Sequence, residues 1–430
     1  MPAAHRHRPS SYARGARIIG LTAILAFAPM VTGCTINTQS VPTASPSVAP
    51  GAPHLPLDSA AITAQFTKLA KGLMIPGAAM LIRTPDGEVT ATYGTTELGG
   101  STPVSLDDHV RVGSNTKTWT ATVILQLVQE GKIALDDPVS KYRPDIPNGK
   151  NITIKELLNM TSGLFNYTET YQINHDMDVN PQTAWDPEQL LAIGVRLPPY
   201  FPPGTGWHYS NTNYILLGLI AQQIEKKPLQ QIFQERFFTP LGLTNTSFPA
   251  IDDSSIPAPY SKGYMYTDNV QTLATSKLPA DLLARAEAGT LLPNDESNAN
   301  PSWAWSAGSG ISTIKDLATW VEAMVAGNLL NPKLQQQRVK DLVATQSPAI
   351  LYGMGLARLG AQFYGHTGEQ PGYNSYMGYD PVNKVTVVVW SNLAPGAKGT
   401  APATTIAREL IDNMYGTATT TPSPKSGDTP

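Results

Sequence analysis

The chain has 430 residues, of which 41% are hydrophobic and 15% are charged, so it can form one large domain or two medium ones with a sizeable core. Its formal net charge is −3, and it becomes −7 without residues 1–33, which hold four of the 30 Lys and Arg and none of the 33 Asp and Glu. This acidic balance argues against nucleic acid as a partner and against a polybasic membrane patch.

The N-terminus has the pattern of a secretory signal peptide. Residues 1–17 contain four arginines and no acidic residue, and residues 18–31, "IIGLTAILAFAPMV", are mostly apolar. This apolar run is shorter than the roughly 20 residues that span a bilayer. A basic segment followed by a short apolar run predicts a signal peptide over residues 1–33.

The four residues "VTGC", Val31–Cys34, resemble the lipobox of bacterial lipoproteins, in which the cysteine is lipidated and becomes the new N-terminus. Cys34 is the only cysteine of the chain, so an internal disulfide is impossible. The resemblance predicts a protein anchored to the cell membrane through a lipid on Cys34, on the extracytoplasmic face. Ordinary secretion with an incidental thiol is the alternative.

Two segments lack the periodicity of helices or strands. Residues 34–57 begin with the lipidated cysteine and continue as a Pro/Ser-rich linker, which several prolines keep semi-extended. Residues 416–430 are predicted to be a disordered tail. A single folded domain is therefore expected over residues 58–415.

Within this domain, strands are predicted near both ends and helices in the middle. An amphipathic helix is expected over Asp58–Lys71, and a hairpin turn at Pro85–Gly87. Helical spacing appears in three later stretches: Ile152–Leu164, Thr212–Lys227 and Thr313–Gly327. Strands return as three segments before a last helix: Gln362–His366, Tyr373–Asp380, Lys384–Asn392 and then the helix Pro402–Tyr415. This order predicts an α+β fold, in which terminal helices flank an antiparallel sheet and a mostly helical region is inserted.

Several common sites have no signature in the sequence. There is no Walker motif and no G-x-S-x-G elbow, which argues against a nucleotide-phosphate site and an α/β-hydrolase. The seven histidines show no metal-ligand spacing. We therefore expect neither a metal nor a cofactor.

Ser114 and Lys117 open the apolar stretch "RVGSNTKTWTATVILQLVQEGK". Residues three apart share one face of a helix, and the first turn offers free N–H groups and the positive end of the helix dipole. A partly desolvated lysine has a lowered pKa and can take a proton, so the pair could be a nucleophile with its own base. Ser-x-x-Lys also occurs by chance, and Ser114 could be an ordinary N-cap.

Two later motifs strengthen the catalytic interpretation. The stretch "WHYSNTNY" contains Tyr209-Ser210-Asn211, and "YGHTGEQPG" contains His366-Thr367-Gly368. The order Ser-x-x-Lys, Tyr-x-Asn, His-Thr-Gly resembles the serine β-lactamase and penicillin-binding superfamily, where the third element is usually Lys-Thr-Gly. Longer segments such as "FPPGTGWHYSNTNYILLGLI" and "WSAGSGISTIKDLATW" resemble its class C branch, and most closely secreted actinomycete D-alanyl-D-alanine carboxypeptidases.

The resemblance implies a role for each motif residue. Ser114 would be the nucleophile, and Lys117 and Tyr209 would share the general base, with Tyr209 passing the proton to the leaving group. Asn211 would bind the substrate amide and hold Lys117. His366 would orient Tyr209 and supply a donor or a positive charge to the substrate.

The resemblance also assigns the oxyanion hole to the backbone N–H groups of Ser114 and Glu369. Thr367 and Gly368 would line the substrate, because a small residue lets substrate backbone lie along the strand. Trp303 and Phe165 could line the acyl-side pocket, although both could equally belong to the core.

Position 369 departs from the family pattern. A small hydroxyl residue is usual after the third motif and helps to hold the terminal carboxylate of the substrate, which Glu369 would repel. Arg358 is the only nearby cation in the sequence that could compensate, and His366 is mostly uncharged at neutral pH.

Four functions therefore stay open. The first is a DD-peptidase, such as a D-alanyl-D-alanine carboxypeptidase, on peptidoglycan stem peptides. The second is an esterase or amidase of the β-lactamase fold on neutral substrates, and the third is a class C-type β-lactamase. The fourth, from another class, is a non-catalytic penicillin-binding lipoprotein.

Overall fold

The computed structural model describes residues 51–416. The predicted signal peptide, the predicted lipidation site at Cys34, most of the predicted linker and nearly all of the predicted tail lie outside the described residues. Among residues 51–416, no helix has the length and apolar character needed to span a bilayer.

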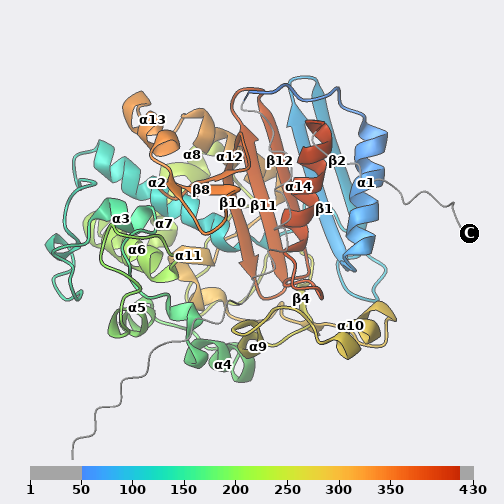
Figure 1. The fold of residues 1–430 in the computed structure, drawn as a ribbon, viewed down its shortest axis with the longest axis horizontal. Helices are drawn as coiled ribbons and strands as arrows, with labels where there is room; N and C mark the ends of the chain where they lie inside the picture. Colours follow the sequence, from blue (N-terminus) through green and yellow to red (C-terminus); the bar gives the residue numbers. More distant parts are fainter. Residues whose placement is uncertain (1–50, 417–430) are drawn as a thin grey trace, which may run out of the picture. The chain divides into compact units, whose positions relative to one another are not determined.

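An eight-stranded antiparallel sheet forms the centre of the domain, with the strand order β2-β1-β12-β11-β10-β9-β8-β7 (Figure 1). Its strands, in chain order, are β1 Gly77–Thr84, β2 Gly87–Gly94, β7 Val343–Ala344, β8 Ile350–Tyr352, β9 Ala357–Leu359, β10 Phe363–Gln370, β11 Tyr373–Asp380 and β12 Val385–Ser391. Two-residue strands form two further pairs: β3 Val110–Arg111 with β6 Ile311–Ser312, and β4 Tyr264–Met265 with β5 Asn294–Asp295.

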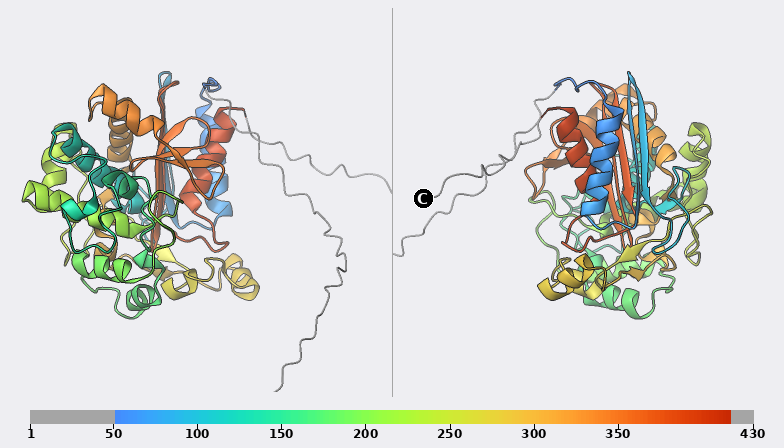
Figure 2. Two further views of the ribbon diagram at one scale, coloured as in Figure 1. Left: turned by 60° about the vertical axis from the view of Figure 1, so that its left-hand side comes forward. Right: turned by 90° about the vertical axis from the view of Figure 1, so that its right-hand side faces the viewer.

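The helices are α1 Ser59–Gly72, α2 Thr116–Gln129, α3 Ile154–Leu158, α4 Tyr171–Val179, α5 Pro187–Arg196, α6 Asn211–Glu225, α7 Leu229–Phe233, α8 Thr239–Leu241, α9 Asn269–Thr272, α10 Ala280–Glu287, α11 Trp305–Gly308, α12 Ile314–Ala326, α13 Pro332–Lys340 and α14 Pro402–Met414. Helices α1 and α14 cover one face of the sheet, and the helical region lies on the other face, as Figure 2 shows with the sheet seen nearly edge-on. The predicted α+β fold with terminal helices around an antiparallel sheet is confirmed.

The central strands read as continuous apolar runs because both of their faces are covered. Every residue of β12 is buried. Its side chains alternate, as the pleat requires: Val387 and Val389 join the core against α1 and α14, and Val388 and Trp390 join the core against the helical region. The sheet thus separates two hydrophobic cores.

The two terminal helices begin and end close to where the sequence predicts. Asp58 caps α1, since its carboxylate accepts a hydrogen bond from the backbone N–H of Ala61. The last residues of the predicted linker contact this layer of the domain. Leu57 packs against the α1/α14 core, and the carbonyl of Ala52 accepts hydrogen bonds from the side chains of Gln362 and Asn383.

Local sequence predicts α6 and α12 within two residues at each end, but it overextends α3. The expected helix Ile152–Leu164 ends after Leu158, and Met160 has a φ of +66°. The chain turns there, and the carbonyl of Met160 accepts a hydrogen bond from the backbone N–H of His208. The segment around α3 therefore packs beside the segment that precedes α6.

Candidate active site

Ser114 lies in a 3₁₀ turn, Gly113–Asn115, that leads directly into α2. Lys117, one turn further on, is buried, and its Nζ lies 3.0 Å from the Ser114 Oγ. Ser114 itself is half-buried, so its hydroxyl can meet a substrate. The spacing of three residues thus places the hydroxyl and the amine on one face, as the sequence predicts.

The Lys117 amine has two further partners. The Asn211 Oδ1 and the Ala307 carbonyl oxygen each lie 2.7 Å from Nζ, and neither atom carries a hydrogen. No carboxylate forms an ion pair with Lys117 among residues 51–416. Burial therefore lowers the pKa of Lys117 well below its usual value. In the neutral amine, the two N–H groups donate to these oxygens, so the lone pair faces the Ser114 hydroxyl and can take its proton.

Tyr209 completes this group from a different part of the chain. It lies two residues before the first residue of α6, with its hydroxyl close enough to Ser114 for the two to affect each other's ionisation and its ring centroid 4.7 Å from the Lys117 Nζ. Burial raises the pKa of Tyr209 far above its usual value. The phenol therefore keeps its proton, which suits a donor to a leaving group, whereas the lowered pKa of Lys117 suits the base.

Strand β10 passes close to the nucleophile because glycines at two positions let backbones meet. A Cβ on Gly368 would lie 1.9 Å from the Val112 carbonyl oxygen, and a Cβ on Gly113, which has a φ of +54°, would lie 2.5 Å from the Glu369 nitrogen. The backbone of Glu369 is thus brought against the turn that carries Ser114. This juxtaposition fits the predicted oxyanion hole, which stays a prediction.

His366 occupies a different environment from the one that the sequence suggests. Its Nε2 lies 3.0 Å from the Tyr352 hydroxyl and its Nδ1 lies 2.5 Å from the Thr367 carbonyl, and its ring is 6.4 Å from the Tyr209 ring without a hydrogen bond between them. Burial, with a further contribution from nearby Lys117, lowers the pKa of His366 to about 3. A ring with this pKa is uncharged at neutral pH, which disfavours a positive charge towards the substrate, and the ring contacts Tyr209 by packing. Its role as a donor to the substrate stays a prediction.

Glu369 is exposed to solvent in the site, although protein surrounds its carboxyl group on most sides. Its only hydrogen-bonding partner among the described residues is the side-chain amide of Asn374, at 3.3 Å. These surroundings raise the pKa of Glu369 to about 7. Arg358, the cation expected to compensate, forms no ion pair in the described part of the chain.

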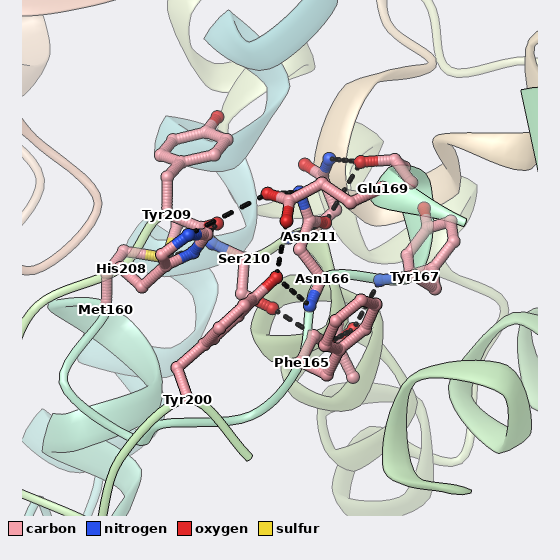
Figure 3. Close-up of polar contacts among 12 residues, drawn as sticks. Met160, Phe165, Asn166, Tyr167, Glu169, Tyr200, His208, Tyr209, Ser210 and Asn211 are labelled. Carbon is pink, nitrogen blue, oxygen red and sulfur yellow. Dashed lines mark hydrogen bonds and ion pairs between the residues drawn. The ribbon is translucent and has the colours of Figure 1, made fainter. Parts of the chain in front are cut away.

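A polar network that the sequence did not predict lies on the other side of Asn211 (Figure 3). The Asn166 Oδ1 accepts a hydrogen bond from the Asn211 backbone N–H at 3.0 Å, and the Asn166 Nδ2 donates to Glu169 at 3.1 Å. Glu169 also accepts from the Tyr200 hydroxyl at 2.6 Å, and the Tyr200 ring stacks on His208 at 3.7 Å. These residues come from three separated segments, so no local motif could have identified them.

The predicted acyl-side aromatics are both half-buried next to this network. Phe165 stacks on Tyr200 at 5.1 Å, and Trp303 packs against the core while its carbonyl accepts a hydrogen bond from the Tyr167 hydroxyl. Thr367 is half-buried on β10. Thr367 belongs to the third motif, and the carbonyl of Phe165 accepts a hydrogen bond from the Ser210 hydroxyl within the second. Contact of Phe165, Trp303 and Thr367 with a substrate stays a prediction.

A cavity of about 350 Å³ opens beside Tyr209. It is lined by side chains of the segment before α6, the β7–β8 loop and strands β8 to β10: Trp207, Tyr209, Thr345, Gln346, Ser347, Ile350, Tyr352, Ala357, Leu359, His366 and Thr367. Among residues 51–416, no three His, Cys, Asp or Glu side chains are arranged to hold a metal ion. The arrangement of Ser114, Lys117 and Tyr209 supports nucleophilic attack on an acyl carbon with proton transfer by protein side chains.

Comparisons with known proteins agree with this chemistry. The sequence model of the Beta-lactamase family matches residues 63–411. A D-stereospecific amidohydrolase from Streptomyces sp. has a similar structure, with a TM-score of 0.70 and 30% identity over 84% of this chain and 100% of that one. The D-amino acid amidase of Ochrobactrum anthropi SV3 shares the fold, with a TM-score of 0.71 and 24% identity over 83% of this chain and 98% of that one.

Curated relatives match over a smaller share of their own length. PbpX of Bacillus subtilis (strain 168) is 28% identical over 287 residues, which are 67% of this chain and 63% of PbpX. Protein flp of Staphylococcus aureus (strain N315) is 35% identical over 188 residues, which are 42% of this chain and 36% of that protein. The chain therefore spans less than two thirds of these relatives.

Proposed function

This chain belongs to the beta-lactamase family, and on that premise we propose that this serine hydrolase cleaves the amide bond on the carboxyl side of a D-amino acid that carries a free amino group. The charge of the site carries the proposal. Two carboxylates, Glu369 and Glu169, lie at or beside it, whereas burial lowers the pKa of both Lys117 and His366 and so favours their uncharged forms. Such a site attracts an ammonium group and repels a carboxylate.

The reaction proceeds through an acyl-enzyme. Lys117 takes the proton of Ser114 while the Oγ–C bond forms, and the backbone N–H groups of Ser114 and Glu369 stabilise the oxyanion. Tyr209 gives its proton to the leaving nitrogen as the C–N bond breaks, and the proton held by Lys117 restores the phenol. Water then attacks the ester by the same groups, which frees Ser114 and releases the acid.

The D-configuration is supported by the amidohydrolase from Streptomyces sp., whose description is D-stereospecific and which aligns over its whole length. The two sequences are only 30% identical, so the stereochemical preference is tested directly. Purified full-length protein is given D- and L-phenylalaninamide and N-acetyl-D-phenylalaninamide. We expect the D-enantiomer with a free amine to have the highest kcat/KM, and the Ser114→Ala variant to release no ammonia. A preference for the L-amide or for the acetylated amide would overturn the proposal.

A D-alanyl-D-alanine carboxypeptidase acting on peptidoglycan stem peptides is the second candidate. The predicted lipid anchor at Cys34 favours it, because the tether would keep the enzyme at the cell wall. The acidic site disfavours it, since the substrate ends in a carboxylate. Faster release of D-alanine from an acyl-D-Ala-D-Ala peptide than of ammonia from D-phenylalaninamide would make this candidate the better one. A chromogenic cephalosporin and a short-chain nitrophenyl ester test the β-lactamase and esterase alternatives in the same assay.

We also propose that the protein is anchored to the extracytoplasmic face of the cell membrane through Cys34. The Cys34→Ser variant should move from the membrane fraction to the medium in the producing bacterium. Retention of that variant in the membrane fraction would contradict the anchor.

A further inference from the structure

We propose that the cavity beside Tyr209 is the leaving-group pocket and that it selects an uncharged, apolar amine or alcohol. This inference rests on the proposed function, because it extends the same acyl-enzyme reaction to its second substrate half. The catalytic groups determine which kind of bond is cleaved, whereas this pocket would determine which leaving groups are accepted.

The position of the cavity assigns it to the leaving group. Tyr209 is the proton donor to the leaving atom, so that atom must lie against the Tyr209 hydroxyl when the C–N or C–O bond breaks. Tyr209 is also part of the cavity wall, together with His366 and Thr367 of β10. Phe165 and Trp303, which are expected on the acyl side, do not line it.

The cavity wall has no charged group. Its apolar surface comes from Trp207, Ile350, Tyr352 and Leu359, and its other polar side chains are hydroxyls and one amide. His366 is neutral here because burial lowers its pKa to about 3. A carboxylate placed in this cavity would lose part of its water without gaining a cation, which is unfavourable.

The wall is fixed by contacts between its own aromatic residues. The Tyr352 hydroxyl lies 3.0 Å from the His366 Nε2, and the Tyr352 ring packs at 6.0 Å from Trp207 and 6.2 Å from Tyr209. The buried indole N–H of Trp207 has no acceptor among residues 51–416. A volume of about 350 Å³ is at the small end of ligand pockets, which suits one aromatic ring or a branched aliphatic group.

The test compares leaving groups on one acyl donor. The full-length protein is given four D-phenylalanyl amides: the primary amide, the N-benzylamide, the dipeptide with D-alanine, and the methyl ester of that dipeptide. We expect the benzylamide to exceed the primary amide in kcat/KM. We also expect the dipeptide methyl ester to exceed the free dipeptide at least tenfold, since the ester replaces the negative charge by a small neutral group. Release of D-phenylalanine is measured in each case, so that cleavage of the methyl ester itself is not counted. Equal values for the dipeptide and its methyl ester, or a faster free dipeptide, would overturn the pocket assignment.

The outcomes for the pocket and for the proposed function are separable. Turnover of the series without a ranking removes the pocket and leaves the function. The same four leaving groups are therefore also placed on an N-acetylated D-phenylalanyl donor. If the protein cleaves only the N-acetylated donor, the proposal of a free-amine substrate fails. The order of kcat/KM among the four leaving groups on that donor still tests the pocket. No turnover of any member would overturn both.

Ile350→Arg introduces a cation at the cavity wall. In the unmodified protein we expect a higher kcat/KM for the methyl ester than for the free dipeptide. In this variant the ratio of these two values should fall at least tenfold, because the arginine would pair with the carboxylate of the free dipeptide. Val382→Arg is the matched control, since Val382 is 64% exposed and lies in the β11–β12 turn outside the cavity wall. An unchanged ratio in soluble Ile350→Arg protein would contradict the inference. If that variant does not fold, the comparison of the two dipeptides on the unmodified protein still decides it.

Discussion

The assignment of Lys117 as the base predicts that a negative charge at position 211 will shift the pH dependence of the reaction. Asn211 accepts a hydrogen bond from the Lys117 Nζ at 2.7 Å, and Asn211→Asp replaces its amide by a carboxylate of nearly the same shape. At an effective dielectric constant of about 20, two unit charges at this 2.7 Å separation attract by about 6 kcal/mol, or about four pKa units. Desolvation of the new carboxylate offsets part of this attraction, so we expect the pKa of Lys117 to rise by at least about two units.

The sign of the effect follows from the protonation state that catalysis needs. The base must be neutral, so activity is present above the pKa of Lys117 and lost as the pH falls through it. A raised pKa moves this acidic limb of the kcat/KM profile to higher pH by the same amount. At a pH below both pKa values the variant should therefore be at least about 100-fold slower than the unmodified protein, and it should recover activity in alkaline buffer.

Asn211→Ala is the matched control. It removes the acceptor without adding a charge, which costs about 1–3 kcal/mol through an unpaired N–H. It should move the limb to lower pH, since the ammonium form loses a partner. Profiles of kcat/KM from pH 5 to 10 for the two variants separate the effects. Coincident acidic limbs in the two variants would refute the assignment of Lys117 as the titrating base.

Three further predictions concern the nucleophile, the charge of the site and the approach of β10. Ser114→Ala should lower kcat/KM by about 10⁵- to 10⁶-fold and abolish covalent labelling by a fluorescent penicillin, and labelling that persists would place the nucleophile elsewhere. Glu369→Gln should raise the KM of a free-amine substrate more than that of its acetylated analogue. This difference should grow from pH 6 to pH 8, because the pKa of Glu369 is about 7 and its carboxyl group becomes charged over that range. Equal KM changes for the two substrates would exclude the contact with an ammonium group. Gly368→Ala puts a Cβ 1.9 Å from the Val112 carbonyl oxygen, so thermal denaturation should show that the free energy of unfolding falls by about 1–3 kcal/mol, and activity should fall with it. Gly72→Ala is the control, because nothing lies within 4 Å of its Cβ, and it should keep both stability and activity.

The features that could be predicted from sequence are those that a few adjacent residues determine. The spacing of Ser114 and Lys117 places them on one face because both lie within the first turns of a single helical segment. Periodicity predicts α6, α12 and α14 nearly to their ends, since each buries a stripe of apolar residues against the sheet or the neighbouring helices. The long strands β11 and β12 are likewise predictable from their length and β-branched or aromatic content.

The features that could not be predicted depend on pairing between distant segments. Strands β7, β8 and β9 have two or three residues each, too few for any periodicity, yet they carry Tyr352 to the His366 ring. The neutral state of His366 depends on that burial, which a His-Thr-Gly motif does not encode. The same holds for Glu169, whose partners Asn166 and Tyr200 reach it from a turn and from a loop 31 residues away.

The two departures from the usual family pattern have a common electrostatic explanation. Position 366 is enclosed, with Tyr352, the Thr367 carbonyl and Lys117 around it and no acidic partner among the described residues. A lysine there would need to bury an ammonium group near the base, and this group would either lose its proton or lower the pKa of Lys117 further. A neutral histidine avoids that conflict, but it leaves the site without a cation for a substrate carboxylate. If the substrate has no carboxylate near position 366, Glu369 has no negative group to repel. Its carboxylate can then bind an ammonium group of the substrate.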